Sequence, residues 1–397
     1  MKEKAILVCS SVKAYKGRRS KNPCICMLIP SFYPLIGGAE QQAGQLARKL
    51  VDKGLKVFIL TRRIKGTEKF EIINGVSVYR TFAKFHTIFF LLSSLLFLIR
   101  HKDNYDIIHV HTLDSPVFVA CIIKKSLKKK VIVKIRGEKS LLNVLRGYLG
   151  KIKLKFIAHN IDYFITVNKG LERELKAMGI GKDRIRMIPN GVDTNELQPL
   201  RTGEKLALKD KLNLPHGKIS TFVGRLIKGK KVDLIIEVWL KIIELMSESY
   251  LLIIGRGPEK EKLKNMIEKC HFYDRVILVG ECPHSLVIKY LQASDVFILA
   301  SESEGISNAM LEAMSVGLPV VAAKISGSEN IIIDKNNGLL FEAGNKEQLQ
   351  SKLVKILSEH DYREKLGKEA RNTVENKFSF DAVIYKYTTL YKELVHG

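Results

Sequence analysis

Short apolar runs rich in Val and Ile alternate with longer segments of helical period from Pro23 onward. This alternation is typical of strand-helix-strand units that build a parallel sheet. In the second half of the chain each apolar run predicts a fully buried strand. The predicted strands are 24–29, 57–60, 107–111, 131–135 and 163–167 in the first half and 219–223, 250–254, 276–279, 296–300 and 319–322 in the second.

The clearest helix is predicted over 39–53, with Leu46 and Leu50 on one face. It should end at Gly54, because glycine suits the left-handed position past a helix end. The longest apolar run, 87–99, is shorter than the roughly 20 residues that cross a bilayer, so it predicts a buried or interfacial helix.

Glycines follow several predicted strands and precede helices, which is where ligands bind in open parallel sheets. Such strand ends occur in both halves and predict an α/β fold with two Rossmann-like parallel-sheet domains that face an interdomain cleft. The expected parts are a basic extension over 1–22, a first domain over 23–195, a second domain over 196–380 and a closing helix over 381–397.

The net charge of +25 is concentrated in the first half, where residues 1–200 hold 37 Lys and Arg against 15 Asp and Glu. This asymmetry indicates an anionic partner, which leaves phosphate groups, nucleic acid and a lipid surface open. The six cysteines show no C-x-x-C spacing, so neither a zinc site nor a disulfide framework is expected. Without a visible signal peptide, we expect a cytoplasmic protein, with a peripheral place on the inner membrane face as an open alternative.

The segment 301–321 combines a strand end, a glycine turn, a helix and a further strand, with Glu304 in the turn and Glu312 in the helix. A helix that starts near Ser307 would aim its first amides at an anion over the strand end. Two carboxylates beside an anion would repel it, so we expect them to accept hydrogen bonds from sugar or ribose hydroxyls. The alternative is that they favour the helix start or pair with surface lysines.

Two further strand-end loops carry candidate groups. The loop 223–233 contains Arg225 and Lys230, whose charges could stabilise a departing diphosphate, although a solvated basic loop is the alternative. The loop around Gly257 is a candidate substrate contact. Lys260 stands where a third glycine would complete a dinucleotide fingerprint, so that fingerprint is not supported.

Taken together, these segments resemble the retaining family 4 glycosyltransferases of GT-B fold over about residues 23–395. The resemblance rests on GGAE at 37–40, YDIIHVH at 105–111, IPNGVD at 188–193, VGRLIKGK at 223–230 and EGISNAMLEAMSVGLPVV at 304–321. It implies a GT-B fold in which 23–195 is the acceptor-side domain and 196–380 is the nucleotide-sugar-binding domain. It also implies that Arg225 and Lys230 hold the donor diphosphate, Glu304 orients the donor sugar and Glu312 binds the ribose. It further implies loop contacts to the donor from Gly305, Ser307 and Asn308. Gly38 would approach the donor phosphates from the other domain.

One departure from the family pattern falls at Arg136, where many members have His before the glycine. Either Arg136 takes over a hydrogen-bonding role or the acceptor chemistry differs, so it is retained as a candidate site residue. His109 and His111 share a strand face, which with Asp114 would fit metal ligands. His111 is alternatively a wall residue near the strand end.

The resemblance implies a metal-independent enzyme with no cofactor that moves a sugar from a nucleotide-sugar donor to a glycan or lipid-linked acceptor, in cell-surface polysaccharide or glycolipid biosynthesis. A sugar-nucleotide 2-epimerase of the same fold is the closest alternative, and a nucleic-acid-binding protein is a remote one, since no RNA- or DNA-binding signature is present. An anionic membrane is a further candidate partner. Its basis is the lysine-rich stretches 124–130 and 151–157.

Overall fold

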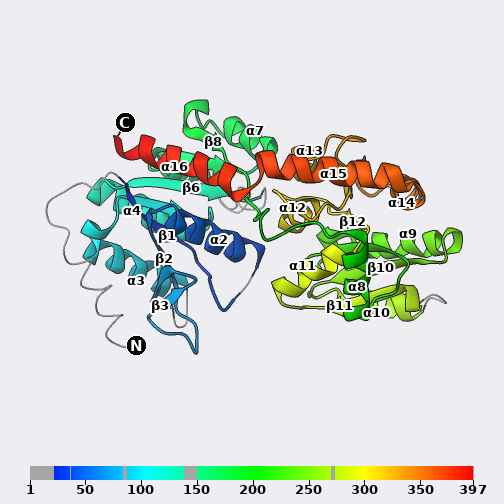
Figure 1. Cartoon of the computed structure of the whole chain (residues 1–397). Coiled ribbons are helices and arrows are strands. Elements are labelled where there is room, and N and C mark those ends of the chain that lie inside the picture. Colours follow the sequence, from blue (N-terminus) through cyan, green and yellow to red (C-terminus); the bar gives the residue numbers. More distant parts are fainter. Residues whose placement is uncertain (1–21, 36, 84–86, 138–149, 270–272, 397) are drawn as a thin grey trace. The chain divides into compact units, whose positions relative to one another are not determined.

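The computed structural model describes residues 22–35, 37–83, 87–137, 150–269 and 273–396. These residues form two compact units. Unit 1 contains the described residues up to Val167, then Glu174–Ile188 and the residues from Ile384 onward. Unit 2 contains Asn168–Arg173 and Pro189–Val383. Figure 1 shows that each unit has a sheet covered by helices.

Unit 1 is built on an eight-stranded sheet in the order β3-β4-β2-β1-β5-β6-β7-β8. All neighbouring strands are parallel except β3 and β4, which form an antiparallel pair. The strands are β1 (Cys24–Leu28), β2 (Lys56–Arg62), β3 (Phe70–Ile73), β4 (Val76–Thr81), β5 (Ile107–Val110), β6 (Lys130–Ile135), β7 (Tyr163–Thr166) and β8 (Ile185–Met187).

The helices of unit 1 include α2 (Gly38–Asp52), which ends before Gly54 at φ +80°, as predicted. Helix α3 (Thr87–Arg100) packs against α4 (Pro116–Leu127), and α4 packs against α6 (Gly150–His159). Helix α16 (Phe380–His396) lies where the closing helix was predicted. Across the described parts of the chain, none of the helices combines the length and apolar character needed to cross a membrane.

Unit 2 is built on a six-stranded parallel sheet in the order β11-β10-β9-β12-β13-β14. The carboxyl ends of β10, β9 and β12 therefore lie next to one another at one edge. The strands are β9 (Lys218–Val223), β10 (Ser249–Ile254), β11 (Val276–Gly280), β12 (Val296–Leu299), β13 (Val320–Ala323) and β14 (Leu339–Phe341).

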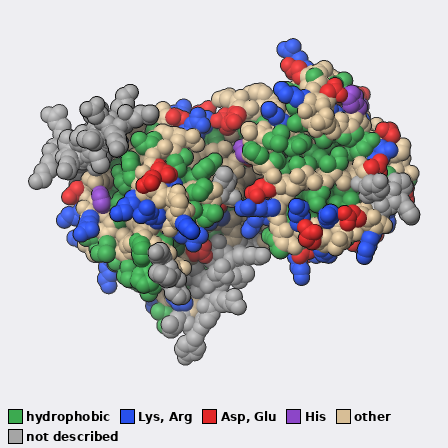
Figure 2. Space-filling model, turned by 90° about the horizontal axis from the view of Figure 1, so that it is seen from below, with side chains coloured by type: hydrophobic (Ala, Val, Ile, Leu, Met, Phe, Trp, Pro, Cys, Tyr) green, Lys and Arg blue, Asp and Glu red, His purple; other side chains and the backbone are tan. Residues whose placement is uncertain are grey.

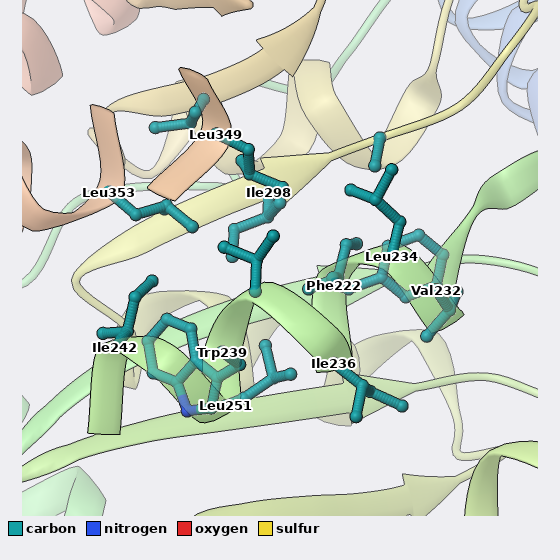
Figure 3. Close-up of a cluster of buried hydrophobic side chains, with 14 of the residues drawn as sticks. Phe222, Val232, Leu234, Ile236, Trp239, Ile242, Leu251, Ile298, Leu349 and Leu353 are labelled. Atoms are coloured by element: carbon teal, nitrogen blue, oxygen red, sulfur yellow. The ribbon is translucent and has the colours of Figure 1, made fainter. Parts of the chain in front are cut away.

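Helices cover both faces of the unit 2 sheet. Neighbouring residues of a strand point to opposite faces, so Phe222 and Thr221 of β9 meet different helices. Phe222 of β9 packs into a core with Trp239 of α9 (Val232–Leu245) and with α14 (Lys346–Ser358), as Figure 3 shows. The adjacent Thr221 hydrogen-bonds at 2.5 Å to Ser294, the residue that caps α11 (His284–Ala293). Helix α11 packs against α8 (Thr202–Lys211) and α12 (Asn308–Ser315).

All ten predicted strands are present, but one expectation about burial was wrong. Strand β11 was expected to be fully buried, and only Val276 is buried there. The reason is its position at the edge of the sheet, where a strand has one neighbour instead of two. The antiparallel β3–β4 pair, joined through Asn74 and Gly75 with positive φ, was not predicted.

Candidate functional site

Three strand ends form the floor of the candidate site in unit 2. The backbone is tightly packed there: a Cβ at Gly255 would lie 1.9 Å from the carbonyl oxygen of Gly224, and a Cβ at Gly257 would lie 2.2 Å from that of Leu226. Such separations are incompatible with any side chain, so these glycines allow the loops after β9 and β10 to lie against each other. Arg225 follows directly after Gly224 in one of these loops.

Lys230 and Glu304 are brought together at this edge, although they lie in different loops. Lys230 ends the short 3₁₀ turn η3 (Lys228–Lys230), and its ammonium forms an ion pair with Glu304 Oε1. The hydroxyl of Ser301 donates to the same carboxylate oxygen at 2.6 Å. The backbone N–H of Glu302 donates to the carbonyl oxygen of Gly229 at 3.0 Å, which ties the two loops together.

Helix α12 begins next to this pair. Ser307 is its N-cap, and the Ser307 hydroxyl accepts from the N–H of Met310 at 3.3 Å, so the helix starts where the sequence indicated. The preceding Gly305 carbonyl accepts from Asn168 Nδ2 at 2.6 Å, and Asn308 Oδ1 accepts from Asn190 Nδ2 at 2.8 Å. Two asparagines from distant parts of the chain therefore hold the loop and the first helical residue in place.

Glu312 lies in the interior of α12 and is buried. Its Oε1 is 3.0 Å from Nε2 of His284, the first residue of α11. Burial of His284 opposes its charged form, and the hydrogen bond and charge of Glu312 outweigh that effect, so the pKa of His284 is raised. A carboxylate with one oxygen engaged by His284 keeps acceptor capacity for a ligand diol.

Unit 1 carries a second cluster at the carboxyl edge of its own sheet. Gly38 begins α2, and Glu40 in the first turn accepts from Ser31 Oγ at 2.8 Å. Arg136 follows β6, and burial lowers its pKa while the nearby carboxylates of Glu40 and Asp114 oppose that change. Charges of both signs therefore meet at this edge.

A buried polar group lies behind this edge, on the face of the sheet that α16 covers. His109 Nδ1 is 2.8 Å from the hydroxyl of Tyr391, and the His109 ring lies 4.1 Å from that of His111. Lys134 is 4% exposed, and its ammonium lies 5.7 Å from the centre of the Tyr387 ring. Burial first and the charge of Arg136 second lower the pKa of Lys134 to about 7.

The two histidines are held neutral in the same surroundings. Burial lowers the pKa of each, and Lys134 adds to the effect on both. In the described residues, Nε2 of His109, Nε2 of His111 and the Tyr387 hydroxyl are buried without a hydrogen-bond partner. Within the same described ranges, no group of three or more His, Cys, Asp or Glu side chains is placed to hold a metal ion.

A cavity of about 500 Å³ opens at the carboxyl edge of unit 1. It lies between the ends of β2 and β5 and the first turns of α3 and α4. Arg62 and Asp114 give it one charge of each sign, and Thr87 and Phe90 from α3 form part of its wall. Its remaining lining combines these charges with apolar side chains.

The predicted site residues fall in both units. Arg225, Lys230, Gly257, Glu304, Gly305, Ser307, Asn308 and Glu312 belong to unit 2, and Gly38, His111 and Arg136 belong to unit 1. His284, Asn168 and Asn190 also hold the candidate site in place, and the sequence patterns did not indicate them. His284 follows a strand end and Pro283 at a helix start, which was the available signal, whereas nothing local to Asn168 links it to a loop 137 residues away.

Two family models match the chain. One described as "Glycosyl transferases group 1" matches residues 204–373, and one described as "Glycosyltransferase Family 4" matches residues 36–196. An uncharacterised glycosyltransferase of Methanocaldococcus jannaschii is 25% identical over 393 residues, which cover 93% of this chain and 98% of that protein.

Solved structures share the fold. Sucrose-phosphate synthase from Thermosynechococcus elongatus matches with a TM-score of 0.80 at 20% identity, over 94% of this chain and 99% of that one. HepE of Anabaena in complex with UDP-glucose matches with a TM-score of 0.78 at 16% identity, over 93% of this chain and 100% of that one. The two parallel-sheet units are thus those of the GT-B fold.

Proposed function

Because the chain belongs to the glycosyltransferases of group 1 and family 4, we propose that it transfers a sugar from a nucleotide-sugar donor to a glycan or lipid-linked acceptor with retention of configuration. The observation that carries the proposal is the edge of unit 2, where Lys230, Glu304, the start of α12 and Glu312 follow neighbouring strands. Cations for a diphosphate and acceptors for hydroxyls are both present there. The HepE structure holds UDP-glucose in a protein of the same fold, which supports a nucleotide-sugar donor.

In this proposal the donor diphosphate lies against Arg225, Lys230 and the first amides of α12. The acceptor hydroxyl attacks the anomeric carbon on the face from which the nucleoside diphosphate leaves. The bond from that carbon to the phosphate oxygen breaks, and a leaving phosphate oxygen takes the hydroxyl proton. The two side-chain cations and the helix amides stabilise the charge that the leaving group gains, so no metal ion is assigned a role.

Glu304 and Glu312 have separate tasks. When diphosphate oxygens approach Lys230, they compete with Glu304 for its ammonium, and the released carboxylate can accept hydrogen bonds from the donor sugar. Glu312 holds the ribose diol while His284 fixes one of its oxygens. Each charged hydrogen bond of this kind contributes about 1.5–3 kcal/mol.

The acceptor belongs to unit 1 in this scheme. Gly38, Arg136 and His111 lie at the carboxyl edge of its sheet or directly behind it, and the cavity beside α3 offers space for a small head group or sugar. An anionic membrane face is the proposed place of work, since the first half of the chain carries most of the positive charge.

A thermal-shift screen with nucleoside diphosphates and their sugars tests the donor assignment. A bound donor at 100 times its dissociation constant should stabilise the protein by about 2.7 kcal/mol. The anomeric configuration of the product, read by NMR coupling constants, tests retention, and full activity in excess EDTA tests metal independence. Inverted product would refute the retaining mechanism, and donor turnover that needs no acceptor would favour the epimerase.

A further inference from the structure

Helix α3 presents an apolar stripe to solvent. Ile88, Leu92, Leu96 and Ile99 follow one another at spacings of four, four and three residues, which places them on one side of a helix, and Phe89 lies beside them. Ile88 is 59% exposed and Leu96 is 61% exposed. The other side of α3 packs on the unit through Phe90, Ser94 and Leu98. A row of large exposed apolar residues on one helix face indicates an interaction surface.

The two neighbouring helices extend this surface. Ile122 of α4 and Ile152 of α6 are exposed, and the ring of Phe156 in α6 stacks on that of Phe118 in α4 with 6.4 Å between centres. Since α3 packs against α4 and α4 packs against α6, the exposed apolar residues belong to adjacent helices of one unit. We name the three helices together the α3–α4–α6 surface.

The charge of this surface has one sign. The three helices contain no Asp or Glu, and their Lys and Arg residues are Arg100, Lys124, Lys125, Lys151, Lys153 and Lys155. Lys124 is neutralised by an ion pair with Asp162 at 2.5 Å, whereas Arg100, Lys125 and the three lysines of α6 are exposed. Figure 2 shows one face of the molecule with apolar side chains at the surface beside Lys and Arg side chains.

We propose that the α3–α4–α6 surface docks on an anionic lipid bilayer, with the α3 stripe among the acyl chains and the basic residues at the head groups. The proposal rests on the function proposed above and specifies where the membrane is met. Exposed apolar residues flanked by Lys and Arg are the features of an interfacial helix. The stripe of α3 ends beside the cavity that Thr87 and Phe90 line, so a lipid-linked acceptor would reach that cavity from the bilayer.

Charge complementarity favours a lipid surface over the other occupants. A second copy of the same surface would bring two basic patches together, which is unfavourable. A nucleic acid would leave the α3 stripe exposed to water, because the phosphate backbone offers no apolar surface to cover it. A bilayer offers anionic groups and hydrocarbon at the same interface.

Co-sedimentation of the full chain with vesicles tests this inference. Vesicles of phosphatidylcholine alone and vesicles with about equal phosphatidylglycerol are compared, since anionic lipid should strengthen binding. Replacing Lys151, Lys153 and Lys155 by Gln should weaken binding about 100-fold, as each surface-proximal lysine contributes about a factor of five. Leu92→Glu with Leu96→Glu should weaken binding at least about tenfold, and Leu245→Glu, an exposed apolar residue of unit 2, is the matched control.

Donor binding is measured by thermal shift on the same variants, because the α3–α4–α6 surface belongs to unit 1 and the proposed donor site belongs to unit 2. Unchanged donor binding with lost vesicle binding is the expected result. Parental protein that binds donor but stays in the supernatant with every vesicle would overturn the docking surface alone. Equal vesicle binding by the Leu92/Leu96 variant and the Leu245 control would also overturn the docking surface. A dimer seen by light scattering, lost in the Leu92/Leu96 variant, together with no binding of the parental protein to vesicles, would show that a second copy covers the surface instead.

Discussion

Lys134→Met tests the electrostatics of the buried cluster in unit 1. Lys134 is an almost fully buried cation, and among the described residues no carboxylate lies within ion-pair distance of it. The unfolded chain holds this proton up to about pH 10.5, while burial and Arg136 lower the folded pKa to about 7. Methionine has similar length, no charge and no proton to lose. It therefore removes the free-energy cost of burying a charged ammonium and keeps most of the packing.

The sign and size of the effect follow from linkage. Between about pH 7 and about pH 10.5 the unfolded state binds more protons than the folded state at this site, so the free energy of unfolding rises with pH. One pH unit corresponds to about 1.36 kcal/mol, which gives about 5 kcal/mol over the whole window. From about pH 7 to about pH 9.5 the parental protein should therefore gain about 3 kcal/mol relative to Lys134→Met.

Urea unfolding followed by far-UV circular dichroism measures this difference at the two pH values. Trp239 is the single tryptophan and lies in the core of unit 2, so its fluorescence reports on the other unit and should respond less. Lys102→Met, at an exposed lysine of the same unit, is the control and should follow the parental pH dependence. If the free energy of unfolding of Lys134→Met rises with pH as much as that of the parental protein, Lys134 is not the titrating group.

Three substitutions in unit 2 test the proposed donor site. Glu312→Ala should raise the calorimetric dissociation constant of the free nucleoside diphosphate by about tenfold or more, since at least one charged hydrogen bond is lost; unchanged affinity would remove the ribose assignment. Lys230→Ala should lower turnover about 100-fold in folded protein, and parental turnover would contradict its role on the leaving group. Gly257→Ala should lower both the melting temperature and donor affinity, because its Cβ would meet the Leu226 carbonyl at 2.2 Å, whereas Gly203→Ala, with nothing within 4 Å, should lower neither.

The sequence predicted those parts of the fold that depend on local pattern. Buried parallel strands are continuous apolar runs, so β1 and β9 were found almost to the residue. Helix α2 was found because Gly54 marks its end. Strands β3 and β14 were missed, since short strands without a long apolar run carry little signal.

The sequence names candidate site residues one by one, but it does not show which of them pair in the fold. The motifs named Lys230 and Glu304 separately, and their ion pair depends on β9 and β12 being neighbours in the sheet. The pairing of Glu312 with His284 depends on α11 starting beside α12, and helix packing of this kind cannot be derived from the local sequence. Which face of α3 is exposed could not be predicted either, because a uniformly apolar segment does not indicate which face is buried.

The Lys230–Glu304 pair also determines how variants at either residue must be read. Both side chains are mostly buried, at 18% and 12% exposure, so removing one leaves the other charge without its partner. A loss of turnover in Lys230→Ala therefore combines a missing cation on the diphosphate with a disturbed Glu304. The double variant with Glu304→Gln separates the two. If Lys230 acts on the leaving group, the double variant recovers stability but turns over far more slowly than Glu304→Gln alone. Equal turnover of the double variant and Glu304→Gln would mean that Lys230 serves only to position Glu304.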